Sequence, residues 1–275
     1  MSKLLTKHLE LVSTSKDGVR RLRQLILDLA VQGKLVPQDP NDEPAKDWLA
    51  GLQKVASIGE IDLNTSLPLP KPPDGWMWCF LQEISNINMG QSPDGKSYNV
   101  SGEGTPLING PVEFSKSPYG TTIKSKWTTE PTKLCKTGDL LICVRGATTG
   151  RTNIAGFDAC IGRGVASIRP VIDFSYFHHF VVANARSFLS LGTGTTFPSI
   201  SKKQIESFPI CIPPLEEQKR IVAKVDELMA LCDELKNQIK QGSELQNLTA
   251  STLLSKAVQS EATEMQETQL ALTSS

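Results

Sequence analysis

The stretch Ile210-Cys-Ile-Pro-Pro-Leu-Glu-Glu-Gln-Lys-Arg-Ile-Val-Ala-Lys-Val-Asp-Glu-Leu228 changes its residue pattern abruptly at the pair Pro213-Pro214. The apolar run 208–212, before the prolines, predicts a buried strand. After the prolines, apolar residues recur at intervals of four and three, the spacing of a coiled-coil seam: Ile221, Val225, Leu228, Cys232, Leu235 and Ile239. Pro214 and the two glutamates that follow it suit a first helical turn. The stretch therefore predicts a globular domain that ends in a strand and continues directly into a long helix.

Composition leaves the class of partner open. The 275 residues carry 29 Lys and Arg against 29 Asp and Glu, so the chain as a whole is not a polycation. Residues 71–210 hold about 14 Lys and Arg against about 10 Asp and Glu, a mild basic surplus. The placement of charge, not its sum, decides whether a surface attracts nucleic acid. A solvated, charge-balanced surface agrees equally well with these counts.

Cysteine and apolar patterns indicate the compartment. The six cysteines form no Cys-x-x-Cys pair, and three of them lie inside apolar runs, namely Cys79, Cys143 and Cys211. This pattern predicts reduced, buried thiols and argues against a disulfide framework or a zinc site. The first residues lack the apolar core of a signal peptide, and no apolar run has the length of a membrane span. The sequence predicts a cytoplasmic protein without a membrane partner.

Prolines and glycines mark boundaries that divide the chain into five parts. An N-terminal helical segment covers 1–66, with one helix stopped by Gly33 and a second at about 46–56. A Pro-rich linker covers 67–74, a β-rich domain 75–212, the long helix 213–260 and a disordered tail 261–275. Gly242-Ser243 predicts a bend or a break in the long helix. The predicted fold class is α+β.

The domain 75–212 combines short strands with one helix. The runs 78–81, 140–144 and 165–169 predict strands between closely spaced turns. Near-helical spacing of Phe177, Phe180, Val181 and Phe188 predicts a helix at about 174–190. We expect these aromatic residues to pack in the core instead of stacking on nucleotides.

The string Pro-Pro-Leu-Glu-Glu-Gln-Lys-Arg-Ile-Val at the domain-to-helix junction closely resembles the end of a target-recognition domain in the DNA-specificity subunits of type I restriction–modification systems. Further stretches resemble the same family in the same order: 18–45, 73–76, 90–93, 136–150 and 195–201. A weak internal repeat relates 25–33 to 252–260, as in a family with two similar long helices. This chain departs from the usual pattern because it has one recognition domain and one long helix where the family has two of each.

The resemblance implies a half-length specificity subunit. Its domain would read one half of a bipartite double-stranded DNA target, and its helices would dock the methyltransferase (M) subunit. That partner would carry S-adenosylmethionine and methylate adenine, and a restriction and motor (R) subunit would use ATP and Mg. No cofactor is expected on this chain. A homodimer on an interrupted palindrome follows, with the seam residues named above as the dimer and subunit interface.

Loops over the domain supply the expected DNA contacts. Arginine can grip guanine, glutamine can grip adenine, and lysine and threonine mostly hold phosphate. The candidates share a loop position and a cationic, amide, hydroxyl or aromatic side chain: Gln91, Ser92, Lys116, Lys124, Lys126, Trp127, Arg145, Thr148, Thr149, Arg151, Arg163, Thr195 and Thr196.

Catalytic motifs are missing from the sequence. The glycine loop 146–150 lacks the lysine of a phosphate-binding loop, and Ile212-Pro-Pro-Leu215 lacks the polar residue of an amino-methyltransferase motif. We therefore expect a non-catalytic subunit. Two alternatives stay open. One is a coiled-coil scaffold whose domain binds protein instead of DNA, and the other is a piece of a full-length subunit that dimerises artificially.

Overall fold

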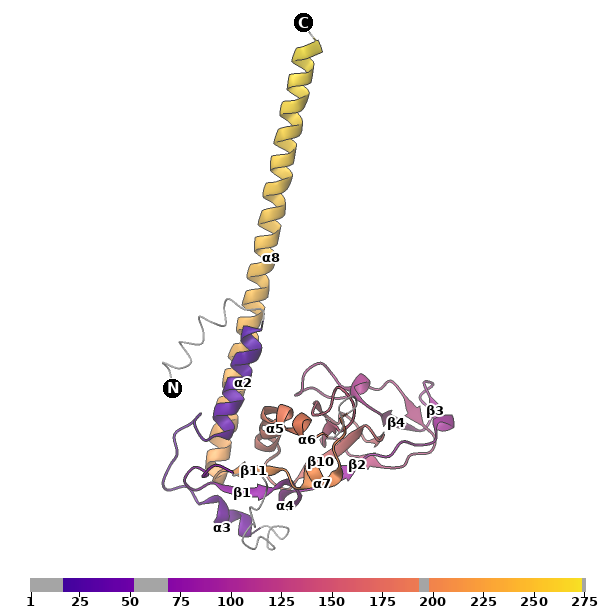
Figure 1. Ribbon diagram of the computed structural model, residues 1–275, viewed down its shortest axis with the longest axis vertical. Coiled ribbons are helices and arrows are strands. Elements are labelled where there is room, and N and C mark those ends of the chain that lie inside the picture. Colours follow the sequence, from indigo (N-terminus) through magenta and orange to yellow (C-terminus); the bar gives the residue numbers. More distant parts are fainter. Residues whose placement is uncertain (1–16, 52–68, 193–197, 274–275) are drawn as a thin grey trace. The chain divides into compact units, whose positions relative to one another are not determined.

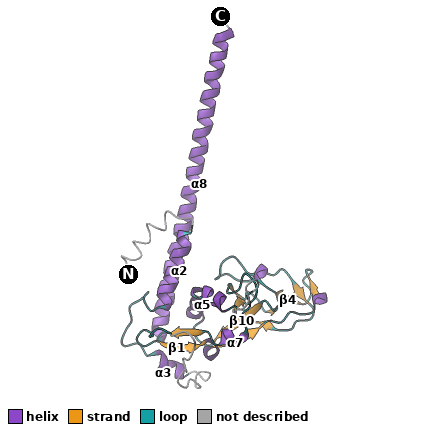
Figure 2. Cartoon of the chain, in the orientation of Figure 1, coloured by secondary structure: helices purple, strands orange, loops and turns teal. Residues whose placement is uncertain are grey.

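The computed structural model describes residues 17–51, 69–192 and 198–273, with the side chains of 254 and 256–273 outside the description. The chain divides into two compact units, one of residues 24–225 and one that joins residues 1–23 to 226–275. Figure 2 shows short strands and helices in the domain, followed by one long helix. The predicted α+β fold is confirmed.

The domain begins and ends in one two-stranded ribbon. Strand β1 (Met77–Phe80) pairs antiparallel with β11 (Pro209–Ile212), with Trp78 opposite Cys211 (Figure 1). Strand β11 is the strand expected before the prolines, and helix α8 (Leu215–Thr273) starts directly after Pro213-Pro214. Because both chain ends of the domain lie in this ladder, the domain is closed at the point where the long helix starts.

A buried hydrogen bond fastens the ribbon to the first turn of α8. The indole N–H of Trp76 donates to Glu217 Oε2 at 3.0 Å, and both side chains are buried. Burial raises the pKa of the Glu217 carboxyl, while the Trp76 hydrogen bond and the charge of Arg220 oppose that rise. Gln218 is also buried and donates to the carbonyl oxygen of Pro213 at 3.0 Å. Two polar residues of the junction string therefore point into the protein and hold the junction together.

The N-terminal segment packs on the same junction. Helix α2 (Gly18–Val31) ends before Gly33, whose φ of 67° is the left-handed conformation expected of a helix stop. The carboxylate of Asp42 forms a two-point ion pair with Arg220 of α8, with a separation of 2.5 Å between Nη2 and Oδ2. The amide of Gln38 donates to the carbonyl oxygen of Asp74 at 2.9 Å. Residues 38–45 thus tie the linker to the start of the long helix.

Two further sheets form the body of the domain. One has the antiparallel order β2 (Ser85–Met89), β10 (Val165–Pro170), β7 (Leu140–Cys143) and β8 (Thr152–Ile154). The other has the order β3 (Tyr98–Asn99), β5 (Trp127–Thr128), β4 (Thr105–Ile108), β9 (Ala159–Ile161) and β6 (Leu134–Cys135). Its pair β4–β9 is parallel. The predicted strands around 78–81, 140–144 and 165–169 are confirmed.

Side chains from both sheets share one core. The buried members come from strands β4, β6, β7, β9 and β10 and from adjoining loops: Ile108, Phe114, Cys135, Leu141, Cys143, Ala155, Ala159, Ile161 and Val165. Every residue of β7 is fully buried, which agrees with its uninterrupted apolar sequence. Short helical turns connect the strands, namely α4 (Leu81–Ile84), η1 (Gly95–Ser97), η2 (Pro111–Glu113) and α7 (Lys202–Glu206).

We predicted a single helix at about 174–190. The prediction is wrong in one respect, because the segment forms two helices. Helix α5 (Phe174–Ala183) and helix α6 (Ala185–Leu191) meet at Asn184, whose φ of −94° and ψ of 13° depart from the helix. The Asn184 side-chain amide donates to the carbonyl oxygen of Phe180 at 2.9 Å, in competition with the backbone pattern. Phe177, Phe180 and Phe188 are buried, so the expected core role of the aromatic residues is confirmed. The other short helix, α3, covers Ala45–Ala50, and residues 52–56 lie outside the described part.

Helix α8 continues through the expected interruption. Gly242 lies inside the helix, and the helix extends to Thr273, past residue 260 where we expected a disordered tail to begin. Next to α2, the first part of the seam is covered, and Arg23 of α2 pairs with Asp233 of α8 at 2.5 Å. Ile221, Val225 and Cys232 are buried, whereas Ile239 is 41% exposed.

The cysteines agree with the buried, unpaired thiols expected from sequence. All six cysteines are free and buried. Burial raises the pKa of the Cys143 thiol to about 11 and that of Cys211 to about 12, which keeps both protonated near neutral pH. Each helix of the described chain is too short or too polar to cross a bilayer.

Replacement of Trp76 by Phe tests the importance of the junction. The substitution leaves a buried carboxylate oxygen without its donor, so we expect the free energy of unfolding to fall by about 1–3 kcal/mol. Denaturant titration of the full chain measures this loss. Trp78→Phe is the matched control, because its indole N–H donates to the Pro70 carbonyl at an exposed site where water can replace it. Equal losses in the two variants would contradict a special role for the Trp76–Glu217 pair.

Candidate nucleic-acid interface

The ends of five strands meet at one place in the domain. Strands β2 and β7 both pair with β10 so that their last residues lie beside its beginning. Strands β4 and β9 run parallel and end together at Ile108 and Ile161. A three-residue connection, Gly162-Arg163-Gly164, leads from β9 into β10 and so joins the two sheets. The loops that leave these strands therefore converge.

Glycines make this junction possible. A Cβ atom on Gly90 would lie 2.7 Å from the carbonyl oxygen of Val165, and one on Gly164 would lie 2.7 Å from that of Asn109. A Cβ atom on Gly162 would overlap the Asn109 side chain. Larger residues would push the two sheets apart, because the obstacles include backbone atoms. The close approach fixes the loops that start here.

A polar hollow of about 520 Å³ lies at the junction. Its lining comes from four separate loops: Asn109, Arg145, Gly146, Arg163, Gly164 and Ser199. Ser92 supports it from below, because its hydroxyl accepts a hydrogen bond from the Arg163 N–H at 3.2 Å and lies 3.5 Å from Asn109 Oδ1. Arg145 forms an antiparallel bridge with Ser199, and the Gly146 N–H donates to the Pro198 carbonyl at 2.9 Å. The backbone beneath both arginines is thus held by hydrogen bonds.

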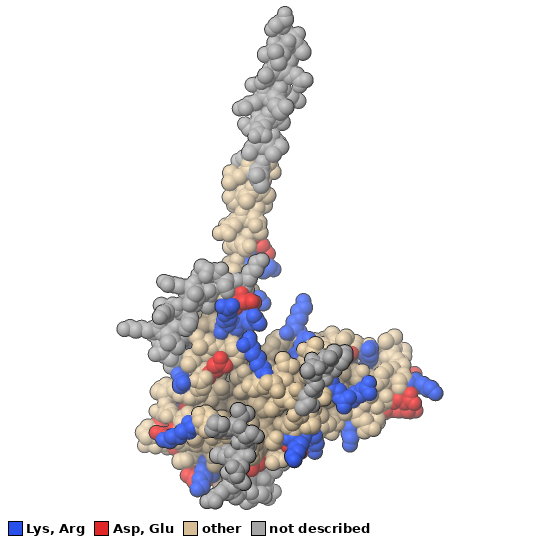
Figure 3. Space-filling model, viewed as in Figure 1, with Lys and Arg blue, Asp and Glu red and all other residues tan. Residues whose placement is uncertain are grey.

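The hollow carries positive charge without a counter-charge. No acidic side chain lines it, and neither Arg145 nor Arg163 forms an ion pair with a described residue. Arg169, by contrast, pairs with Asp139 at 2.6 Å. Figure 3 shows further Lys and Arg side chains in separate patches over the domain. Such a hollow suits a ligand that offers hydrogen-bond acceptors or negative charge.

The loop between β4 and β5 is anchored by a buried carboxylate. Glu113 is 1% exposed and accepts hydrogen bonds from the Asn109 N–H, the Gly110 N–H and the Ser125 hydroxyl. The side-chain amide of Asn153, also buried, donates to Ser115 Oγ at 2.9 Å and binds the loop from below. These contacts give a long surface loop a fixed shape.

An aromatic contact fixes the tip of the same loop. The Tyr119 hydroxyl lies 3.0 Å from His179 Nδ1, and the Tyr119 ring lies 4.8 Å from the His178 ring. His178 Nε2 lies 3.1 Å from the Pro118 carbonyl oxygen, which indicates that this nitrogen carries the proton. Burial, followed by the neighbouring His179, lowers the pKa of His178 to about 4. The two histidines are therefore structural residues of α5 that hold the loop.

Most of the predicted contact residues are exposed or partly buried in the structure. Gln91, Lys116, Lys124, Lys126, Arg145 and Arg163 are exposed, and Ser92, Trp127 and Thr148 are partly buried. The ammonium group of Lys124 lies 5.1 Å from the centre of the Phe157 ring. The structure brings Ser92, Arg145 and Arg163 together, and the three lysines lie on the β4–β5 loop.

Two of the predicted residues also form hydrogen bonds within the loops. Thr149 is buried, and its hydroxyl donates to the carbonyl oxygens of Gly146 and Pro198. The Arg151 guanidinium donates to the Ser115 carbonyl at 3.0 Å. Thr195 and Thr196 lie outside the described residues. Direct contact with DNA stays a prediction for the whole set.

Sequence reasoning missed the residues that hold the loops. Glu113 and Asn153 carry no motif, and Ser199 became part of the hollow only through its bridge to Arg145. The signal available was weak: a single acidic residue follows Gly110-Pro111 in an otherwise basic loop.

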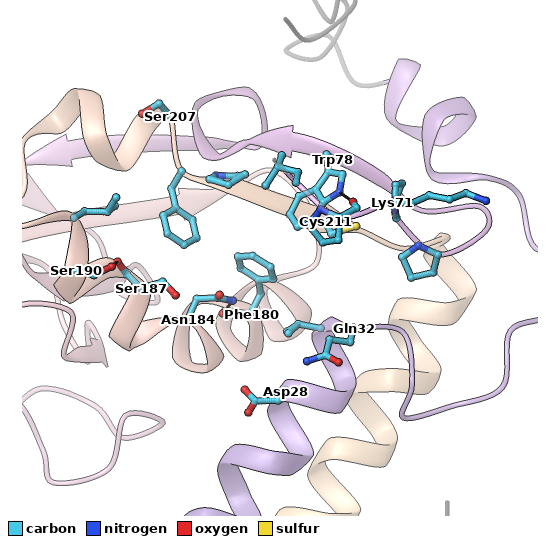
Figure 4. A pocket seen from close by; sticks show the side chains of 18 of the residues that line it. Asp28, Gln32, Lys71, Trp78, Phe180, Asn184, Ser187, Ser190, Ser207 and Cys211 are labelled. Carbon is cyan, nitrogen blue, oxygen red and sulfur yellow. Dashed lines mark hydrogen bonds between the residues drawn. The ribbon is translucent and has the colours of Figure 1, made fainter. Parts of the chain in front are cut away.

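A second, larger hollow of about 920 Å³ lies between the end of α2, the Pro-rich linker and helices α5 and α6. Figure 4 shows Phe180 and Trp78 facing it, with Asn184 and Ser187 along one side. Its lining is mainly apolar, and its two lysines, Lys34 and Lys71, are accompanied by the carboxylate of Asp28. The described residues also contain no group of three or more His, Cys, Asp or Glu side chains arranged to hold a metal ion.

Comparison with known families agrees with this geometry. A family model described as the type I restriction modification DNA specificity domain matches residues 73–245. That match includes the ribbon, both sheets, the polar hollow and the first part of α8.

Individual relatives give the same result. The type I restriction enzyme EcoAI specificity subunit of Escherichia coli is 32% identical over 260 residues, which cover 86% of this chain and 44% of that protein. The solved HsdS subunit from Thermoanaerobacter tengcongensis is 28% identical with a TM-score of 0.54, covering 85% of this chain and 51% of that one. A solved chain from work on complex assembly and conformational transition of the type I R-M system is 30% identical with a TM-score of 0.57, covering 90% and 56%. This chain spans about half the length of the curated relatives it matches.

Replacement of Glu113 by Ala tests the loop anchor. Removal of a buried acceptor of three hydrogen bonds should lower the free energy of unfolding by about 1.5–3 kcal/mol. It should also speed hydrogen exchange at the Asn109 and Gly110 amides, which lose their acceptor. Glu103→Ala, at an exposed site, should change stability by less than about 0.5 kcal/mol. Unchanged exchange at those amides would show that the loop is held by other contacts.

Proposed function

Because the chain belongs to the type I restriction modification DNA specificity family, we propose that it is the non-catalytic component that selects the DNA target of such a system. Its domain reads one half of a bipartite double-stranded sequence. The observation that carries this proposal is the hollow with Arg145 and Arg163, set among fixed loops that carry Lys116, Lys124 and Lys126.

This arrangement supplies the two kinds of contact that sequence-specific binding needs. Lysines on surface loops can neutralise phosphates and set the position of the domain on the duplex. Side chains held by a fixed backbone can present donors to base edges. Glu113, Asn153 and the Tyr119–His179 contact keep the β4–β5 loop in shape before DNA arrives, which lowers the entropic cost of binding.

The proposed active form is a homodimer. Residues 75–212 form one domain of the proposed DNA-reading kind, whereas a bipartite target needs two. Large apolar side chains also remain uncovered along α8: Ile239, Leu245, Leu248 and Leu253 are 41% to 65% exposed. Burial of such side chains against a second helix would stabilise a dimer.

The proposed partners follow from the family. One of the similar solved chains comes from work on complex assembly of the type I R-M system. We propose that α2 and α8 dock a methyltransferase subunit, which would carry S-adenosylmethionine, and that a restriction subunit with ATP and Mg joins through that complex. We also propose that the chain works in the cytoplasm, with the DNA that it reads.

Salt dependence of binding separates DNA recognition from a protein scaffold. For the full chain on duplex DNA, the logarithm of affinity should fall linearly with the logarithm of salt concentration, by about 0.9 for each phosphate contacted. Lys116→Ala, Lys124→Ala and Lys126→Ala should each reduce the slope by about 1. Lys202→Ala, on α7 and paired with Glu206, is the control and should leave the slope unchanged. A chain that fails to bind duplex DNA at low salt would favour the scaffold.

Symmetry of the target tests the dimer. Two identical domains related by a twofold axis must read the same bases on opposite strands, so a methylome should show an interrupted palindrome. Ile239→Asp would place a carboxylate in the seam and should convert the dimer to a monomer in light scattering, with loss of the palindromic mark. Asn237→Asp, at an exposed polar position on the opposite face of the helix, should retain both. An asymmetric bipartite mark would contradict the symmetric half-subunit.

A further inference from the structure

Two arginines that form no ion pair with a described residue line the polar hollow. Arg145 enters from the loop after β7 and Arg163 from the connection between β9 and β10. Both side chains are exposed, and no carboxylate lines the hollow. Two like charges that share a hollow repel each other, so the arrangement is stabilised when a ligand supplies acceptors to both.

We infer that Arg145 and Arg163 read guanine, so that each half-site of the target contains a G·C pair contacted through the major groove. This inference rests on the proposed function and adds to it the identity of a base. Guanine presents the acceptors O6 and N7 side by side on its major-groove edge. The planar fork of arginine matches that pair with two parallel N–H donors, which a lysine ammonium cannot do.

Guanine fits the hollow better than a backbone phosphate for a structural reason. The backbone of both arginines is fixed, by the Ser92 hydroxyl under Arg163 and by the Ser199 bridge and the Gly146–Pro198 hydrogen bond beside Arg145. The Val144 N–H, next to Arg145, donates to the carbonyl oxygen of Gly164, next to Arg163, at 2.9 Å and fixes these two loops relative to each other. A fixed backbone favours contacts that depend on orientation, whereas phosphate contacts tolerate a flexible cation.

The surrounding cationic residues have roles other than base contact. The exposed lysines of the β4–β5 loop lie outside the lining of the hollow and can hold phosphate. Two other arginines of the domain contact the protein itself, since Arg169 pairs with Asp139 and Arg151 donates to the Ser115 carbonyl. Arg186, exposed on α6 and without an ion pair among the described residues, lies outside the hollow and provides a matched control.

Selection from a random duplex library tests the inference with the full chain and its methyltransferase subunit. The wild type should select a motif whose half-site contains guanine. Arg145→Ala or Arg163→Ala should reduce the preference for guanine at one position by about 5- to 150-fold. Arg145→Lys and Arg163→Lys should fail to restore it, and Arg186→Ala should leave the motif unchanged.

A modified base locates the contact. Replacement of the selected guanine by 7-deazaguanine, which lacks the N7 acceptor, should weaken binding by the wild type and have no further effect on the arginine variant that lost the preference. A selected motif without guanine would overturn the inference and leave the proposed function standing. Uniform weakening on all sequences, with a smaller salt slope and rescue by lysine, would assign the arginines to phosphate and also overturn it. Selection of no motif by the wild type would overturn the proposed function, and the inference with it.

Discussion

The ladder between β1 and β11 is the constraint on which the rest of the structure depends. It pairs residue 77 with residue 212, so the domain between them starts and ends in the same two-stranded ribbon. The Trp76–Glu217 hydrogen bond and the Asp42–Arg220 ion pair then fix the ribbon to the first turns of α8 and to the N-terminal segment. Burial of the Glu217 carboxylate costs solvation energy, and the indole donor and the nearby guanidinium offset that cost.

Within the domain, close packing of backbone against backbone positions the interface. Gly90, Gly162 and Gly164 permit strands from two sheets to end at one point. This close approach fixes the positions at which the loops begin. Because the junction is fixed by main-chain contacts, the side chains above it can differ between proteins without loss of the fold. A scaffold of this kind suits a module that must accept different targets.

Buried polar groups give the long β4–β5 loop its shape. Glu113 and Asn153 satisfy main-chain groups that a loop would otherwise expose to water, and Tyr119 packs on the histidines of α5. Such groups are costly to bury alone, but here each has partners within the loop or beneath it. The loop therefore has a fixed conformation, while its lysines remain at the surface.

The sequence by itself determined the elements whose signals are local. The change of period at Pro213-Pro214 predicted both β11 and α8, the apolar run 140–144 predicted a buried strand, and the aromatic spacing after residue 174 predicted core residues. Only the tertiary structure decided which loop residues are available. Arg151 and Thr149 have the side chains of surface donors. The Arg151 guanidinium, however, donates to the carbonyl of Ser115, 36 residues away in sequence, and the Thr149 hydroxyl donates to that of Pro198, 49 residues away. A single sequence carries no signal for such contacts, because they arise where separate strands end together.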